Sequence, residues 1–126
     1  MSGADEIFAL ARDFEEASSK VASGLYDAFK EGGEGFRDDW RRNVEASSPH
    51  GHLKHLPAAI TSETVLAFGI EVVTGPERGR RQGALGRGDE FGSENQAPHL
   101  NGLRAMPDAE RRIDQLSEAA IGRALP

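Results

Sequence analysis

Cysteine is absent from the 126-residue sequence. The chain therefore cannot form a disulfide framework, a thiolate metal site or a cysteine nucleophile, and we expect a protein that is made and kept in a reducing cytoplasm. Aromatic residues make up only 6% of the chain and hydrophobic residues 37%, which predicts a lean core. We expect part of the apolar surface to be buried against other copies of the chain.

Long apolar runs are missing as well. No stretch approaches the roughly 18 consecutive apolar residues of a membrane-spanning helix, so we expect no membrane partner. Residues 1–6 are acidic and lack the basic region of a signal peptide, so we expect no secretion signal. The net charge of -6 argues against a whole-surface binder of nucleic acid, which usually carries a basic footprint.

The length favours one domain over residues 1–126. Apolar residues recur at helical spacing from residue 4 to 47, which predicts helix there. Glycines within residues 32–35 interrupt this pattern, and each costs about 1 kcal/mol against alanine inside a helix. We therefore expect two helical pieces joined by a kink or short turn. Trp40, the only tryptophan, is expected to pack in the core.

Residues 58–92 are expected to hold strands and an extended loop. Their first half is rich in β-branched residues and then alternates apolar with other residues, the pattern of half-buried strands. We expect two antiparallel strands with a turn within 65–69, and a third short strand at 90–92. Pro107 suits the first turn of a helix, which predicts a C-terminal helix over 107–125. The fold class is therefore α+β, with N-terminal helices, a small antiparallel sheet, a long Gly/Arg-rich loop and a C-terminal helix.

A glycine-rich stretch, residues 82–100, separates the expected strands from the last helix. Its glycines within 83–88 are spaced like a phosphate cradle. Asp89 and Glu90 follow at once and would repel phosphate, and no Gly-Lys-Ser/Thr sequence appears. We interpret the stretch as a contact loop, with a flexible arm over 83–88 that becomes ordered on assembly.

A local basic surplus lies beside this stretch. Between residues 77 and 88 a single carboxylate, Glu77, is opposed by four arginines: Arg78, Arg80, Arg81 and Arg87. Arginines of this kind can contact DNA phosphates, so a DNA-binding module is one alternative function. No aromatic residue is interleaved with them, and a solvated surface or salt bridges to an acidic neighbour are the simpler interpretation.

Most of the histidines fall in one short segment: His50, His52 and His55. Histidine is a common metal ligand, so a small metal-dependent enzyme using these residues is a second alternative. Pro49 and Pro57 flank the segment, and no carboxylate or cysteine lies within it. Solvated histidines in an irregular loop are the simpler interpretation.

Nucleophilic catalysis is not supported by the sequence. His99 could combine with Asp89 and Ser93 as a triad. Ser93, however, lacks the strand–turn–helix elbow that would expose a nucleophile. We expect no catalytic residues, no metal and no cofactor.

Several short motifs together resemble a known family. They are Trp40 with Asn43, His50-Gly51, Pro57, Ile60-Thr61, Glu90-Phe91-Gly92-Ser93 and Ala97-Pro98-His99-Leu100. In this order they resemble the small tail-component proteins of long-tailed bacteriophages, the gene-product-ten-like minor tail proteins that act in tail completion and at the neck. The chain departs from the family pattern at Leu56, where members often have tyrosine, and at Ala84, where they have methionine.

The resemblance implies a structural virion protein of the head–tail joint, without enzymatic activity. Such a protein forms a homo-oligomeric ring, commonly a hexamer, around the DNA channel between connector and tail tube, as a tail terminator, tail-completion or neck component. Its partners would be neighbouring neck or connector and tail-tube proteins, with assembly in the host cytoplasm and final location in the virion. The subunit interface would then include Phe91, Gly92, Pro98, His99 and Leu100. The lumen side would present Arg78, Arg80, Arg81 and Arg87 to passing DNA.

Overall fold

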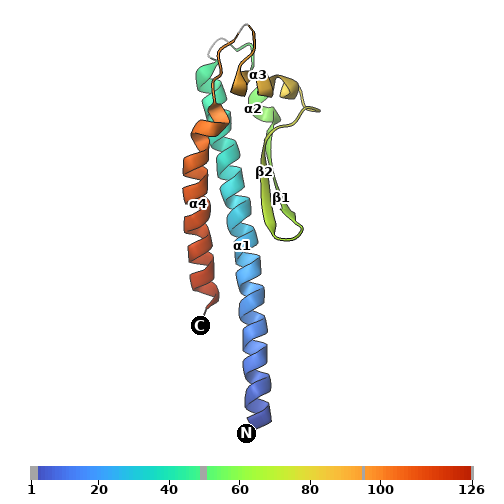
Figure 1. Ribbon diagram of the computed structural model, residues 1–126, viewed down its shortest axis with the longest axis vertical. Helices are drawn as coiled ribbons and strands as arrows, with labels where there is room; N and C mark the ends of the chain where they lie inside the picture. Colours follow the sequence, from blue (N-terminus) through green and yellow to red (C-terminus); the bar gives the residue numbers. More distant parts are fainter. Residues whose placement is uncertain (1–2, 49–50, 95, 126) are drawn as a thin grey trace.

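The computed structural model of the protein describes residues 3–48, 51–94 and 96–125. In chain order the elements are α1 (Gly3–Ser47), α2 (Leu56–Ala59), β1 (Ile60–Leu66), β2 (Ile70–Pro76), the 3-10 turn η1 (Gly83–Leu85), α3 (Gly86–Phe91) and α4 (Asn101–Ala124). The fold is α+β, as predicted. Helix α4 lies antiparallel to the C-terminal half of α1, and the β1–β2 hairpin covers another side of α1 (Figure 1).

Helix α1 dominates the molecule. It is a single helix of 45 residues, which corresponds to a length of about 67 Å at 1.5 Å per residue. Its N-terminal part continues well past the C-terminal end of α4 (Figure 1). The other elements pack against the part of α1 near its C-terminal end. The small core therefore lies at that end of the molecule.

The predicted kink within residues 32–35 is wrong, because α1 is continuous there. Gly32 and Gly33 are buried, and the reason is the close approach of other elements. A Cβ atom at Gly32 would overlap Ile113 of α4, and one at Gly33 would lie 2.5 Å from Val72 Cγ1 of β2. These glycines let α4 and the hairpin pack against the helix; they do not interrupt it.

The hairpin agrees with the predicted pair of antiparallel strands. Its register runs from Ile60 opposite Pro76 to Leu66 opposite Ile70, which places the turn at residues 67–69. The Arg41 side chain donates two hydrogen bonds, of 3.1 and 2.7 Å, to the Ile60 carbonyl oxygen. This contact joins the start of the hairpin to α1 beside the buried core, which consists of Val44, Leu53, Leu56, Ala59 and Ile60 with Trp40 against it.

Three further expectations for the second half of the chain are wrong. The short strand at 90–92 is instead the end of helix α3, and the flexible arm over 83–88 is a 3-10 turn followed by that helix. Gly83 fits against the Glu77 carbonyl, and Gly86 fits against Pro76, which holds the glycine-rich segment in place. The last helix begins at Asn101, so that Pro107 lies inside it.

Substitution of Gly32 tests the close packing of α1 on α4. We expect Gly32→Ala to lower the free energy of unfolding by about 1–3 kcal/mol, because the added methyl group overpacks the contact with Ile113. Gly122→Ala is the matched control, since nothing lies within 4 Å of a Cβ atom there. The control should stabilise the protein by about 1 kcal/mol through helix propensity. Urea unfolding of both variants measures the difference, and equal stabilisation by both would contradict the packing.

Candidate interaction site

Two adjacent carboxylates are buried where α3 meets α4. Asp89 is 3% exposed and Glu90 6% exposed. The two carboxylate oxygens of Glu90 accept hydrogen bonds from the backbone N–H groups of Gly102 and Leu103, at 2.8 and 2.9 Å. The first turn of a helix has unpaired N–H groups and a partial positive charge. Glu90 therefore caps α4 from outside the helix, where Leu100 at the N-cap position offers no side-chain hydrogen bond.

Asp89 connects the same junction to α1 through Asn101. One of its oxygens lies 2.6 Å from His99 Nδ1, and the other accepts a hydrogen bond of 3.0 Å from the Asn101 amide. Asn101 is fully buried; its amide also donates to Ser47 Oγ of α1, and its carbonyl oxygen accepts from the Asn43 side chain, both at 2.9 Å. We call Asp89, Glu90, His99 and Asn101 the carboxylate cluster.

The carboxylate cluster does not form the catalytic triad considered from the sequence. His99 pairs with Asp89, but among the described residues no hydrogen bond joins His99 to Ser93. The Ser93 backbone N–H instead donates to the Gln96 carbonyl oxygen in a tight turn. The absence of catalytic residues stays a prediction. The hydrogen bonds of the carboxylate cluster connect α1, α3 and α4.

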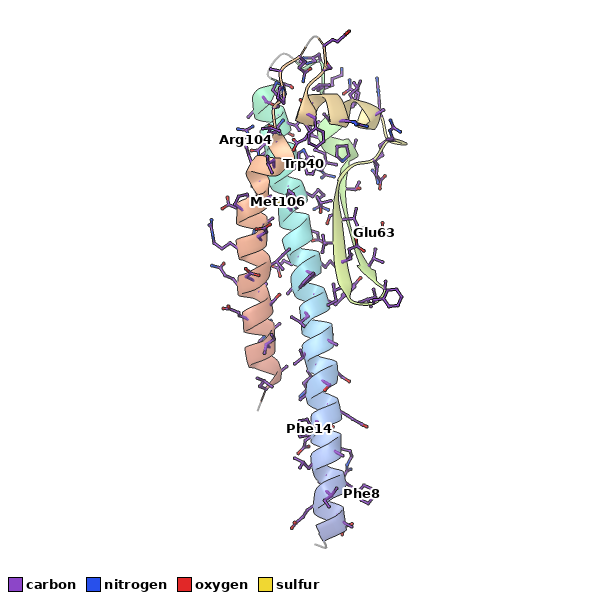
Figure 2. The ribbon with its side chains drawn as sticks, in the orientation of Figure 1. Phe8, Phe14, Trp40, Glu63, Arg104 and Met106 are labelled. Carbon is purple, nitrogen blue, oxygen red and sulfur yellow. The ribbon has the colours of Figure 1, made fainter. Side chains whose placement is uncertain are left out.

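An apolar groove of about 410 Å³ lies beside the carboxylate cluster. Its apolar lining comes from α1, the end of β2, η1, α3 and α4: Phe36, Trp40, Pro76, Ala84, Phe91, Leu103 and Met106. We call it the α3–α4 groove. Trp40 and Met106 lie at the same end of the molecule (Figure 2). Phe91 is 69% exposed and Leu103 54% exposed, so large apolar side chains face solvent at this place.

The floor of the groove is set by Trp40. Its indole ring stacks on Phe36, with ring centroids 5.6 Å apart. A Cβ atom at Gly102 would lie only 2.6 Å from this indole, so the first turn of α4 lies directly on it. Trp40 packs against the core as predicted, and it also shapes a surface that the sequence did not predict.

The four arginines expected to touch DNA do not act alike. Arg78 and Arg87 are exposed side chains in the lining of the groove. Arg80 pairs with Glu77 at 2.7 Å, and the hydrogen bonds from Arg80 and then Thr61 lower the pKa of the Glu77 carboxyl. Within the described parts of the chain, Arg78, Arg81 and Arg87 form no ion pair. A basic rim at the groove is therefore observed, whereas DNA contact stays a prediction.

The histidine segment is only partly described, because His50 lies outside the described residues. Burial, followed by the charges of Arg81 and Lys54, lowers the pKa of His55; its Nε2 atom is buried and has no hydrogen-bond partner. Both effects favour the uncharged form of the His55 imidazole. Across residues 3–48, 51–94 and 96–125, no three His, Cys, Asp or Glu side chains form a group that could hold a metal ion. The three-histidine hypothesis is untested.

The predicted interface residues lie around the carboxylate cluster. Phe91 lines the groove and Pro98 is exposed, while His99 and Leu100 are half-buried. Gly92 has a φ of 83°, in the left-handed region that favours glycine, and it ends α3. Contact of these residues with another subunit stays a prediction.

The helices of the described chain include none with the length and apolar character needed to cross a membrane.

Sequence reasoning missed the buried roles of Asp89, Glu90 and Asn101. It treated the first two as loop carboxylates that would repel phosphate, whereas the structure buries both of them. A cap normally lies within the sequence that starts its helix. Glu90 acts from outside α4, so no local pattern indicated it.

Neutralising Glu90 tests the capping contact. We expect Glu90→Gln to lower the free energy of unfolding by about 1–3 kcal/mol, because a glutamine amide keeps one acceptor oxygen and leaves one of the two backbone N–H groups without its partner. Glu94→Gln is the control, because Glu94 is exposed and surface changes usually stay within about 0.5 kcal/mol. Denaturant unfolding gives the energies, and amide hydrogen exchange in the first turn of α4 gives the location. Equal stability of the two variants would show that Glu90 does not hold α4.

Comparison of the chain with protein-family models, with curated proteins and with solved structures finds no match in any of the three. The resemblance to phage tail-component proteins therefore rests on the motifs of the chain itself.

Proposed function

We propose that this protein is a structural component of the head–tail joint of a long-tailed bacteriophage, a tail-completion or neck protein that forms a homo-oligomeric ring around the DNA channel. One observation carries the proposal. The motifs of the resemblance are far apart in the sequence, yet Trp40 packs against the core that contains Ile60 and lines the same groove as Glu90 and Phe91. The Leu100 backbone N–H donates a hydrogen bond of 3.0 Å to the Glu90 carbonyl oxygen. Motifs that meet in one place are parts of one structural unit, which supports their interpretation as one signature.

Exposed apolar side chains support an assembly role. Phe8 and Phe14 of α1 are 67% and 68% exposed, and Phe91 of α3 is 69% exposed. Concentrations of large exposed apolar side chains mark interaction surfaces. A small protein with few aromatic residues leaves most of its phenylalanines outside the core, which suits a protein completed by neighbours.

We propose that DNA moving through the channel contacts the two arginines that do not line the groove. Arg80 and Arg81 are exposed beside it, and a phosphate contact from them would be weak and independent of sequence. Unchanged retention of packaged DNA in particles carrying Arg80→Gln with Arg81→Gln would contradict this contact.

The proposed function is tested in the phage whose genome encodes the chain. We expect mass spectrometry of purified virions to find the protein at a constant copy number, and electron microscopy of the purified protein to show rings. Deletion of its gene should leave filled heads and tails that fail to join. A wild-type copy supplied in trans is the control and should restore joined particles. A protein absent from virions, with normal particles after deletion, would contradict the proposal.

A further inference from the structure

The N-terminal end of α1 presents an uncovered apolar stripe. We call residues 3–16 the N-terminal arm; each of them except Ala9 is exposed. Ile7, Leu10 and Phe14 recur at spacings of three and four residues, which places them on one helix face, and they are 58–68% exposed. Phe8 and Phe14 lie on the part of α1 that extends past α4 (Figure 2).

The stripe continues a face that α4 covers further along α1. Gly24 meets Ala120, and Gly32 meets Ile113. Leu125, just after α4, lies beside Asp13 and Ala17 of α1. Beyond that level the same face of α1 is uncovered in the described structure, although its residues remain apolar. The arm therefore has one apolar face of the kind that a helix normally packs against another surface.

Charge distinguishes the occupants that the arm would fit. The arm carries five carboxylates, Asp5, Glu6, Asp13, Glu15 and Glu16, against the single cation Arg12. Helices that lie on membranes are rich in Lys and Arg on the polar face, which is the opposite arrangement. The α3–α4 groove has the complementary surface, since its lining is mostly apolar and carries Arg78 and Arg87, which form no ion pair with another described residue. The carboxylate in its lining, Glu90, already accepts hydrogen bonds from the first turn of α4 with both oxygens.

The arm cannot reach the groove of its own chain. Phe14 and Trp40 belong to one continuous helix, and the 26 residue steps from one to the other correspond to about 39 Å at 1.5 Å per residue. The N-terminal end of α1 lies at the opposite end of the molecule from α3 and the start of α4 (Figure 1), two of the elements that line the groove. Only a second molecule can bring the two surfaces together.

We infer that the N-terminal arm of one copy docks its apolar stripe in the α3–α4 groove of the next copy. The arm carboxylates then face Arg78 and Arg87, and complementary charge fixes the orientation of the pair. Each copy inserts its arm into one neighbour and receives the arm of another in its groove, so the contact is heterologous. The copies form a closed ring when the rotation between neighbours adds up to a full turn. The inference deepens the proposed function and rests on it in assuming that copies of this chain meet one another.

The experiment uses two variants of the full chain, each lacking one half of the contact. Leu10→Glu with Phe14→Glu disables the arm, and Arg78→Glu with Arg87→Glu disables the groove; all four side chains are exposed, so folding should be retained, as circular dichroism will check. We expect the wild type to form oligomers in analytical ultracentrifugation. Each variant alone should associate at least about tenfold more weakly, a difference of 1.4 kcal/mol.

An equimolar mixture of the two variants identifies the geometry. One intact arm and one intact groove remain between them, so we expect heterodimers that do not grow into larger species. Phe68→Glu is the control for an exposed phenylalanine elsewhere, and it should assemble like the wild type. Full assembly of the arm variant, or absence of heterodimers in the mixture, would overturn the inference. A monomeric wild type, including one that sediments with phosphatidylcholine–phosphatidylglycerol vesicles, would also overturn it.

The outcomes separate this inference from the proposed function. Rings that form as well with the disabled arm would overturn the arm contact and leave the virion role standing. Arm-dependent oligomers of a protein that is absent from virions would support the contact and contradict the role in the head–tail joint.

Discussion

The contact on which the rest of the structure depends is that of the Glu90 carboxylate with the start of α4. Two backbone N–H groups, of Gly102 and Leu103, donate to it from the end of the helix, where the helix dipole favours negative charge. This contact fixes where α4 begins and lays its first turn on Trp40. The path of α4 along α1, and one wall of the α3–α4 groove, follow from that starting point.

Periodicity predicted the elements that depend on their own residues. The apolar spacing of α1 and the β-branched residues of the hairpin indicated a helix and two antiparallel strands, and both are confirmed. Glycine was misinterpreted twice. At Gly32 the penalty for glycine in an isolated helix does not include what packs against it, and at Gly83 glycine was interpreted as part of a flexible arm. Each of these glycines lies where another element comes too close for a side chain.

The candidate site was predictable only in its parts. Two of the arginines, Arg78 and Arg87, lie in the groove with Phe91, and the Pro98–Leu100 step joins α3 to α4; the sequence singled them out by charge and by motif. The groove was not predictable, because its walls come from elements that are distant in the chain and meet only when the chain folds. A buried Asp89 beside a fully buried Asn101 is a tertiary arrangement that no local spacing reveals.

The long α1 helix explains how one chain can carry two complementary surfaces without closing on itself. A flexible linker between the arm and the groove would let them meet within one molecule, and the apolar residues would be covered there. A continuous helix holds them about 39 Å apart along its axis. The lean core and the exposed phenylalanines then have a common cause in the proposed assembly: the apolar surface that one copy cannot bury is the surface that the next copy covers.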